Sequence, residues 1–385
     1  MTLCDCPEKD LPSLPINPDL PEGVPRLRSF YLYLSSSCNL RCRHCWITPE
    51  YSADKATAGT FIDPNALKKA VIEGKLLGLR SAKLTGGEPM LHPQFKEIVS
   101  LLTAEGLSLN METNGTLMTR EMANFLKTET TVDFISVSID SPIPAEHDAF
   151  RGVPGAFDAA IRGLDFLVEA GYTNCQVIMS VHRGNGDQIE DLIQLAIEHK
   201  AASVKFNPVT RVGRGIKMHE KGDAPGYSEY LELARYIHEE LRLQYQIPLF
   251  LPMPLALTPF NELWRTKGGT SDCAVVGILG ILGSGDIALC GIGQTNPELV
   301  YGKLGRDNIR DIWLHHPTIL GLRKDLSDHV QYPGICHSCI HAKVCRTGCV
   351  ASNYLNCGIM VSPNWLCEEA DRRGQFPKNR IKSDN

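Results

Sequence analysis

Strand-like and helix-like stretches alternate through the first half of the chain, and this alternation restricts the fold more than any other feature. Six strand-like runs occupy residues 30–36, 81–85, 108–112, 134–139, 175–181 and 203–207. Helix-like stretches lie between them at 64–77, 93–105, 120–127, 156–170 and 188–199. This order predicts an α/β fold with a parallel sheet and right-handed crossover helices. Asp63 and Asp187 precede two of the helices and are expected to cap them.

Six strand–helix units are too few to close an eight-fold barrel, so we expect an open, partial (β/α)6 TIM-like barrel. In such folds the reactive groups gather at the carboxyl ends of the strands. Polar or small residues follow several of the predicted strands: Cys38 follows the first, 86–89 the second, 113–115 the third and Asp140 the fourth.

The remaining chain divides by composition. Residues 1–26 are proline-rich and are read as an irregular leader, and the barrel is assigned to 27–225. A helical and proline-broken bridge covers 226–266, a glycine- and cysteine-rich domain with short strands covers 267–370, and a tail covers 371–385.

Charge and hydropathy exclude two classes of partner. The net charge is −5 with acidic and basic residues interleaved, which does not suit a nucleic-acid or membrane-surface binder. The longest apolar runs are too short to span a bilayer, and the N-terminus has no secretion signal, so we expect a cytoplasmic protein. Fourteen cysteines in such a chain are expected to be metal or cluster ligands, because the cytosol keeps thiols reduced.

The sharpest motif is Cys38-x3-Cys42-x2-Cys45, directly after the first predicted strand. Three thiolates at this spacing can hold three corners of a [4Fe–4S] cube and leave the fourth iron open. A structural zinc site is the alternative, but it needs four closed ligands. His44 could be the fourth, although its position next to Cys45 would strain such a site.

With these residues the sequence resembles the radical S-adenosylmethionine (SAM) superfamily, from about residue 28 to residue 369. Gly86-Gly87-Glu88-Pro89 matches the family's GGEP motif after the second strand, and His44 takes the aromatic position near the adenine of SAM. Glu88 would then offer an anion to the ammonium of SAM, so its charge is expected to matter to the ligand rather than to the core. Asn114, Ser138 and Arg151 match further SAM contacts, and a surface arginine is the alternative for Arg151. The family's glycine-rich motif on the fifth strand is not evident, because Cys175-Gln-Val-Ile-Met-Ser stands there.

The resemblance implies reductive cleavage of SAM to a 5′-deoxyadenosyl radical, which abstracts hydrogen from an unactivated C–H bond. It also implies a protein electron donor such as flavodoxin or ferredoxin.

The C-terminal cysteines resemble the seven-cysteine SPASM domain, which implies two further [4Fe–4S] clusters and therefore three in all. By this resemblance Cys336, Cys339, Cys345 and Cys367 hold the outer auxiliary cluster, and Cys273, Cys290 and Cys349 hold the inner one. The fourth position of the inner cluster is left open, to be filled by Cys357, by another group or by the substrate. The alternative for this region is a zinc-bound structural module.

Enzymes with this pair of domains mostly modify ribosomally made peptides, by crosslinking, epimerisation or backbone excision. The resemblance therefore implies a precursor peptide as substrate. The short leader before Arg28 also leads us to expect a separate small leader-peptide-recognition protein. The alternatives are a small-molecule metabolite as substrate and, more remotely, a non-catalytic iron–sulfur or zinc module.

Cys175 and Cys357 are candidate hydrogen donors, which redox-neutral epimerisation would require. For Cys175 a small buried residue on a strand is the favoured interpretation. Cys4 and Cys6 lie in the leader and are expected to have no catalytic role.

Overall fold

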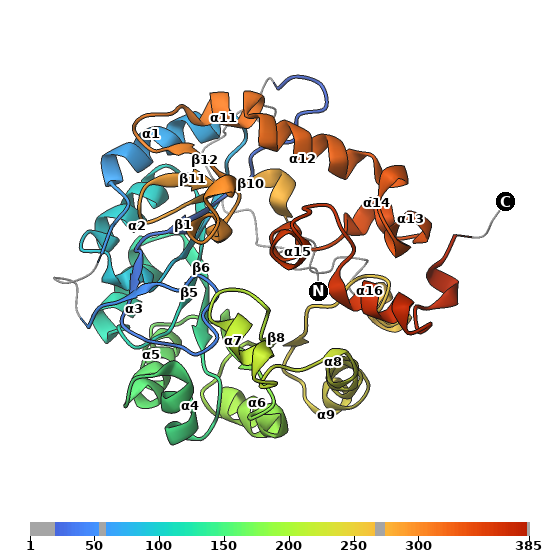
Figure 1. Ribbon diagram of the computed structural model, residues 1–385. Coiled ribbons are helices and arrows are strands. Elements are labelled where there is room, and N and C mark those ends of the chain that lie inside the picture. Colours follow the sequence, from blue (N-terminus) through green and yellow to red (C-terminus); the bar gives the residue numbers. More distant parts are fainter. Residues whose placement is uncertain (1–19, 54–58, 266–273, 383–385) are drawn as a thin grey trace.

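The computed structural model describes residues 20–53, 59–265 and 274–382 of the chain (Figure 1). Most of its strands form one ten-stranded sheet in the order β12-β11-β10-β1-β4-β5-β6-β7-β8-β9. The strands of this sheet are β1 (Ser29–Tyr33), β4 (Ser81–Thr85), β5 (Ser108–Thr113), β6 (Val132–Ser138), β7 (Cys175–Val181), β8 (Ser203–Pro208), β9 (Leu249–Phe250), β10 (Ile278–Ile281), β11 (Asp286–Ala288) and β12 (Val300–Lys303). A separate pair joins β2 (Ser37–Cys38) to β3 (Glu50–Tyr51).

Helices connect the parallel strands and continue through the C-terminal region. They are α1 (Pro64–Lys75), α2 (Phe95–Ala104), α3 (Arg120–Glu129), α4 (Pro144–Arg151), α5 (Ala156–Glu169), α6 (Ile189–Glu198), α7 (Gly215–Glu220), α8 (Tyr227–Arg235), α9 (Arg242–Gln244), α10 (Phe260–Arg265), α11 (Ile309–His315), α12 (Pro317–Ser327), α13 (Ile335–Ser338), α14 (Ala342–Cys345), α15 (Val350–Cys357) and α16 (Trp365–Arg372). A π-helical segment, Tyr236–Leu241, joins α8 to α9.

The partial barrel expected from the sequence is confirmed. All six predicted strands form and pair in parallel from β1 to β8. Alternate residues of these strands, such as Leu32, Leu84 and Met111, are fully buried in the main core with the apolar sides of the helices. The opposite residues of each strand face the inner side of the barrel, where the burial pattern is mixed.

The cysteine-rich region extends the sheet of the barrel. β10 pairs in parallel with β1, so that Gly280 lies opposite Tyr31, and β11 and β12 continue the sheet in antiparallel fashion. The region also docks on the outer helices: the backbone NH of Ile309 in α11 donates to Glu73 Oε2 of α1 at 2.8 Å. Figure 1 shows α11 beside α1, with the last helices, in orange to red, along one side of the molecule.

Two local expectations have different outcomes. Asp63 caps α1 as predicted, since its Oδ1 accepts from the backbone NH of Asn65 at 3.0 Å. The Asp187 cap was wrong: Asp187 lies within a 3-10 turn, and α6 begins two residues later at Ile189. α4 was not expected from the sequence, and its last residue, Arg151, contacts the cysteine loop.

Within the described part of the chain, no helix combines the length and apolar character needed to cross a membrane.

The glycine at position 280 permits a close backbone approach that ties β10 to the turn after β11. A Cβ at this position would lie 2.7 Å from the Cα of Cys290, and backbone atoms cannot rotate away. We predict that Gly280→Ala lowers the free energy of unfolding by about 1–3 kcal/mol, the usual cost of overpacking. Gly321→Ala is the control, because a Cβ there meets nothing within 4 Å inside α12. It should stabilise the protein by about 0.5–1 kcal/mol. Urea denaturation of both variants tests this, and equal stability of the two would contradict it.

Candidate active site

The three cysteines of the Cys38–Cys45 motif lie on one loop that begins at the end of β2. Cys38 and Cys42 are buried and Cys45 is half-buried. Burial raises the pKa of Cys38 and of Cys45, and the neighbouring thiol of Cys42 raises both further. The three sulfurs therefore lie near one another in a place with little water.

The turn after β4 presses its backbone against this loop. A Cβ on Gly87 would lie 1.9 Å from the carbonyl oxygen of Ser37, and Gly86 has a φ of +133°, which favours glycine. The backbone NH of Glu88 donates to the Ser37 carbonyl at 3.0 Å. Both glycines of the GGEP motif are thus required for the backbone to fit here.

The carboxylate of Glu88 is fully buried and joins the ends of β4 and β5. It accepts hydrogen bonds from Thr113 Oγ1 at 2.8 Å, from the backbone NH of Asn114 at 2.9 Å and from the backbone NH of Met90 at 3.3 Å. Burial raises the pKa of Glu88 to about 7, while these three donors oppose the rise. Both oxygens are therefore engaged within the protein, and Pro89 begins the short 3-10 turn that follows.

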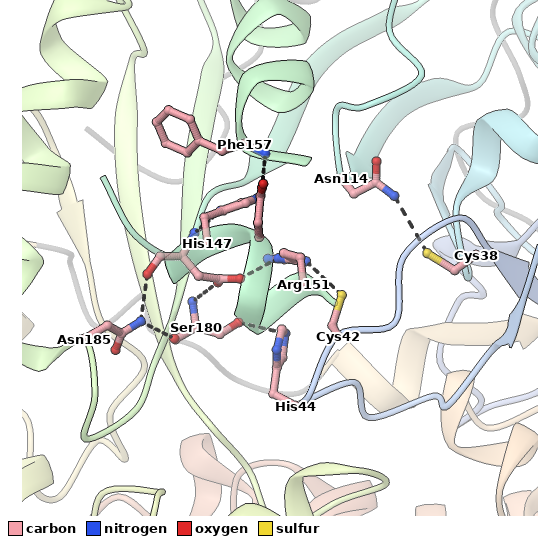
Figure 2. Close-up of polar contacts among 11 residues, drawn as sticks. Cys38, Cys42, His44, Asn114, His147, Arg151, Phe157, Ser180 and Asn185 are labelled. Carbon is pink, nitrogen blue, oxygen red and sulfur yellow. Dashed lines mark hydrogen bonds and ion pairs between the residues drawn. The ribbon is translucent and has the colours of Figure 1, made fainter. Parts of the chain in front are cut away.

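Asn114 connects the end of β5 to the cysteine loop. Its Nδ2 donates to Asn39 Oδ1 at 2.8 Å and lies 3.7 Å from Cys38 Sγ (Figure 2). Its Oδ1 accepts from the backbone NH of Thr116 at 2.9 Å. Ser138 is the last residue of β6 and lies half-buried at the same edge of the sheet.

A buried ion pair holds the other side of the loop. Arg151, at the end of α4, is 6% exposed, and its Nε lies 2.5 Å from Oδ2 of Asp140, which is 1% exposed. Arg151 Nη1 lies 3.6 Å from Cys42 Sγ (Figure 2). The surface alternative for Arg151 is excluded, because the guanidinium is buried between a carboxylate and a cysteine of the motif.

His44 lies in a stack of three rings. Its imidazole is stacked on Phe150 with ring centroids 4.7 Å apart, and Phe150 is stacked on His182 at 4.4 Å. His44 Nε2 and Ser180 Oγ form a hydrogen bond of 3.0 Å, and burial lowers the pKa of His44 to about 3. His44 is therefore neutral and its ring is held in place.

Three of these residues were not expected at the site from the sequence: Ser180, Phe150 and His182. Ser180 belongs to the Cys175-Gln-Val-Ile-Met-Ser stretch, where the family's glycine-rich motif is not evident. The feature of the sequence that could have pointed to Ser180 is that it is a polar residue near the carboxyl end of a predicted strand.

The residues at this edge of the sheet fit a [4Fe–4S] cluster. The donor set is three free thiols on one loop, with Arg151 and Asn114 nitrogens close to two of the sulfurs. Among the described residues, no three His, Cys, Asp or Glu side chains gather as they would around a single metal ion. A cube binds each thiolate through a different iron and needs no such convergence.

The four cysteines assigned to the outer auxiliary cluster come together in the fold. Burial raises the pKa of Cys336 to about 12, and Cys345 and Cys339 raise it further because their thiols are close. Cys367 is buried, and the same three thiols raise its pKa. The spacing in the sequence therefore corresponds to one group of sulfurs in space.

Of the three cysteines assigned to the inner cluster, two are described. Burial raises the pKa of Cys290 to about 12, and the thiol of Cys349 contributes to the rise. The Cys290 backbone packs on Gly280, which is paired with Tyr31 of β1. Cys273 lies outside the described residues, as do Cys4 and Cys6.

The two candidate hydrogen donors, Cys175 and Cys357, lie away from these groups of cysteines. Cys175 is buried at the first position of β7, about 20 Å along the strand from its carboxyl end. Cys349 caps the beginning of α15 and Cys357 is its last residue, so eight helical steps separate the two by about 12 Å along the helix. Cys357 is exposed, and its thiol donates a hydrogen bond to the Asn353 carbonyl at 3.3 Å.

The geometry around Glu88 yields a prediction that differs from the expectation based on sequence. In Glu88→Gln the amide NH2 cannot accept a hydrogen bond, so at least one buried donor loses its partner at a cost of about 1–3 kcal/mol. We therefore predict a clear fall in the thermal midpoint. The control is Glu121→Gln, which removes an exposed ion pair with Lys96 of little energetic value. An unchanged midpoint together with lost SAM binding would instead support a direct contact between Glu88 and SAM.

Comparison with known proteins gives a consistent family. The model of the radical SAM superfamily matches residues 32–196. An AdoMet-dependent heme synthase of Nitratidesulfovibrio vulgaris is 30% identical over 379 residues, covering 92% of this chain and 95% of the relative. The mycofactocin maturase MftC of Mycolicibacterium smegmatis is 25% identical over 359 residues, covering 91% of this chain and 84% of the relative.

Among solved structures, Streptococcus suis SuiB bound to its precursor peptide SuiA has a similar fold. The TM-score is 0.68 at 16% identity, and the match covers 90% of this chain and 76% of SuiB. The likeness extends over the barrel and most of the cysteine-rich region. The cysteine loop, the fold and the similarity to the heme synthase over nearly its full length agree. This chain therefore belongs to the radical SAM superfamily and is an enzyme that uses a [4Fe–4S] cluster and SAM.

Proposed function

We propose that this enzyme modifies a ribosomally made peptide by abstracting a hydrogen atom from it. The observation that carries the proposal is the joining of two sets of thiols by one sheet. The cysteine loop lies at the carboxyl ends of the barrel strands, and Cys290 packs on β10, directly beside β1. Two cluster sites on one continuous sheet would flank a substrate between them, and SuiB, with a similar fold, binds a precursor peptide.

In this proposal the residues of the first site have separate tasks. Cys38, Cys42 and Cys45 hold the cluster. Asn114 and Arg151 are positioned to donate to the sulfurs of Cys38 and Cys42, and such bonds stabilise thiolates. The stacked, neutral His44 offers a flat surface for the adenine of SAM, and Gly86 and Gly87 let the turn after β4 pack against the cysteine loop.

With a reduced [4Fe–4S] cluster and SAM bound, the site would supply radical chemistry that can remove a hydrogen atom from an unactivated C–H bond. The protein's part is to place that bond and to exclude water from the buried loop. Cys336, Cys339, Cys345 and Cys367 would hold the outer auxiliary cluster, and Cys290 and Cys349, with Cys273, the inner one. A flavodoxin or ferredoxin is the proposed electron donor, and a small leader-binding protein a proposed partner.

The positions of Cys175 and Cys357 do not support a role as hydrogen donor. Cys175 lies at the amino end of its strand, and burial raises the pKa of its thiol to about 12. The structure gives it the surroundings of a packing residue. Cys357 lies at the far end of α15 from Cys349, which places it unfavourably as the fourth ligand of the inner cluster.

A second candidate is a reaction on a small molecule. The heme synthase relative supports it, because the similarity to this chain covers 95% of that protein at 30% identity.

We predict that replacing Cys38, Cys42 and Cys45 together with alanine abolishes 5′-deoxyadenosine formation and leaves the C-terminal thiols able to assemble clusters. The reason is that the two groups of thiols belong to different parts of the fold. After anaerobic reconstitution, iron should fall from about twelve to about eight per chain, which is four irons for one cube. Loss of all iron would show that the sites are interdependent, and retained 5′-deoxyadenosine would contradict the assignment.

Co-expression tests the substrate class. This chain is produced anaerobically with each short reading frame adjacent to its gene, with and without any small partner encoded there, and the peptides are analysed by intact mass and deuterium incorporation. We expect one peptide to change in mass or to gain deuterium, as crosslinking, excision or inversion requires. The cysteine triple variant is the matched control. Unchanged peptides, together with SAM cleavage that depends on a metabolite, would select the second candidate.

A further inference from the structure

The inner side of the barrel contains charged residues where such barrels usually carry apolar ones. Lys83 on β4, Glu112 on β5 and Lys205 on β8 all occupy inward positions, because their strand neighbours Leu84, Met111 and Val204 are fully buried on the helix side. Lys83 pairs with Asn110 in the sheet, and Lys205 pairs with Ile178. We call Lys83, Glu112 and Lys205 the inner charge cluster.

The three charges face one another across the barrel. β5 and β8 are separated by two strands in the sheet, yet their charges interact: Lys83 and, to a smaller extent, Lys205 lower the pKa of Glu112. Burial lowers the pKa of Lys205, and the Glu112 carboxylate opposes this shift. Side chains on strands this far apart reach each other only by pointing inward. The cluster is therefore a feature of the space that the barrel encloses.

The charges within the cluster do not balance. Glu112 forms an ion pair with Lys83 and accepts a hydrogen bond from Thr85 Oγ1 at 3.5 Å. Lys83 also lies over the ring of Tyr31, 5.2 Å from its centroid. Lys205 makes no hydrogen bond or ion pair with any residue that the structure describes. Two ammonium groups share one carboxylate, and one positive charge is left over.

An ammonium without a partner in such a place is costly, and folding alone gives no reason to keep it. The cluster is also accessible: the side chains of Lys83 and Glu112 are 28% and 36% exposed. A ligand can therefore reach this layer. A single excess charge on a lysine matches a singly charged anion, whereas arginine forks are the usual partners of phosphate.

The position of Lys205 distinguishes it from the proposed SAM site. Lys205 lies three residues before the end of β8, about 10 Å below the carboxyl edge where the cysteine loop lies. In the sheet Lys83 of β4 pairs with Tyr31 of β1, and Tyr31 pairs with Gly280 of β10. The backbone of Cys290 packs against Gly280. Lys83 thus lies two strands away from β10, on which the Cys290 backbone packs.

We propose that Lys205, supported by Lys83, binds a carboxylate of the substrate on the inner side of the barrel. This proposal adds a substrate-binding residue to the proposed function. It rests on the proposed function only for the identity of the molecule that carries the carboxylate. A peptide offers one at its C-terminus or on an acidic side chain, and a metabolite offers one directly.

The test measures binding, not turnover, on the reconstituted full chain. The probes are the dipeptide acid N-acetyl-Ala-Ala, the same dipeptide as its C-terminal amide, and glutarate as a small carboxylate. Binding is measured by calorimetry, and protection of Lys205 from reductive methylation by mass spectrometry. The variants are Lys205→Met, Lys205→Arg, which keeps the charge, and Lys69→Met on α1, a lysine whose side chain is 71% exposed.

We expect the dipeptide acid to bind the wild type and the Lys69→Met variant alike and to protect Lys205. Lys205→Met should weaken it about tenfold or more, the loss expected for a hydrogen bond to a charged group, and Lys205→Arg should restore most of the affinity. The amide should bind no better to the wild type than to Lys205→Met. Equal binding of acid and amide, or unchanged affinity in Lys205→Met, would overturn the proposal.

Thermal unfolding separates binding from a merely structural role. If Lys205 is kept for a ligand, Lys205→Met leaves the midpoint unchanged or raises it, because it removes an unpartnered charge. A lowered midpoint with unchanged affinity would mean that Lys205 only balances Glu112, and would overturn the proposal. Protection of Lys205 by glutarate but not by the dipeptide acid would support the carboxylate site while contradicting a peptide substrate.

Discussion

The buried ion pair between Asp140 and Arg151 is the interaction on which the candidate active site depends. Asp140 follows β6, and its second oxygen accepts from the backbone NH of Ser180 at 2.8 Å, so it also fixes the end of β7. Arg151 carries this position to the cysteine loop, because its carbonyl accepts from the backbone NH of Arg41 at 2.9 Å. A buried ion pair adds little net stability, but removing one partner leaves the other charge buried and unpaired, which is costly. Its effect here is to fix one geometry of the loop.

The loop is held from two other sides by backbone contacts. The turn after β4 rests against Ser37 because Gly87 has no side chain. At the start of α7, the backbone NH of Arg214 donates to the Cys45 carbonyl at 3.0 Å, and a Cβ on Gly213 would lie 2.7 Å from the same oxygen. The segments that follow β4, β6 and β8 thus determine where the three sulfurs of the cysteine loop lie. A loop held in this way needs no ordering when a cluster and SAM bind, which is the advantage of preorganisation.

The sequence predicted what depends on local pattern and missed what depends on distant pairing. Buried strands such as β7 and amphipathic helices such as α5 were recognised because their apolar spacing is regular. α4 was missed because it is short and polar, with His147, Asp148 and Arg151 among its eight residues. The sequence could not place β10 beside β1, since the two strands lie more than two hundred residues apart. The residues of β10, Ile-Leu-Gly-Ile, also do not indicate which strand they pair with. The spacing of Cys336, Cys339 and Cys345 indicated one group of sulfurs, but the distance from Cys349 to Cys357 emerged only with α15.

Glu88 and Lys205 show why the chemistry of a residue type does not by itself assign a role. Glu88 stands in a motif associated with SAM, yet both of its oxygens are used to join two strand ends. Lys205 stands in no motif, yet it is an inward-facing charge to which the described residues offer no hydrogen bond or ion pair. A carboxylate with three donors stabilises the fold, whereas an ammonium with none does not. The balance of donors and charges around a side chain therefore separates residues that build this site from those kept for what binds in it.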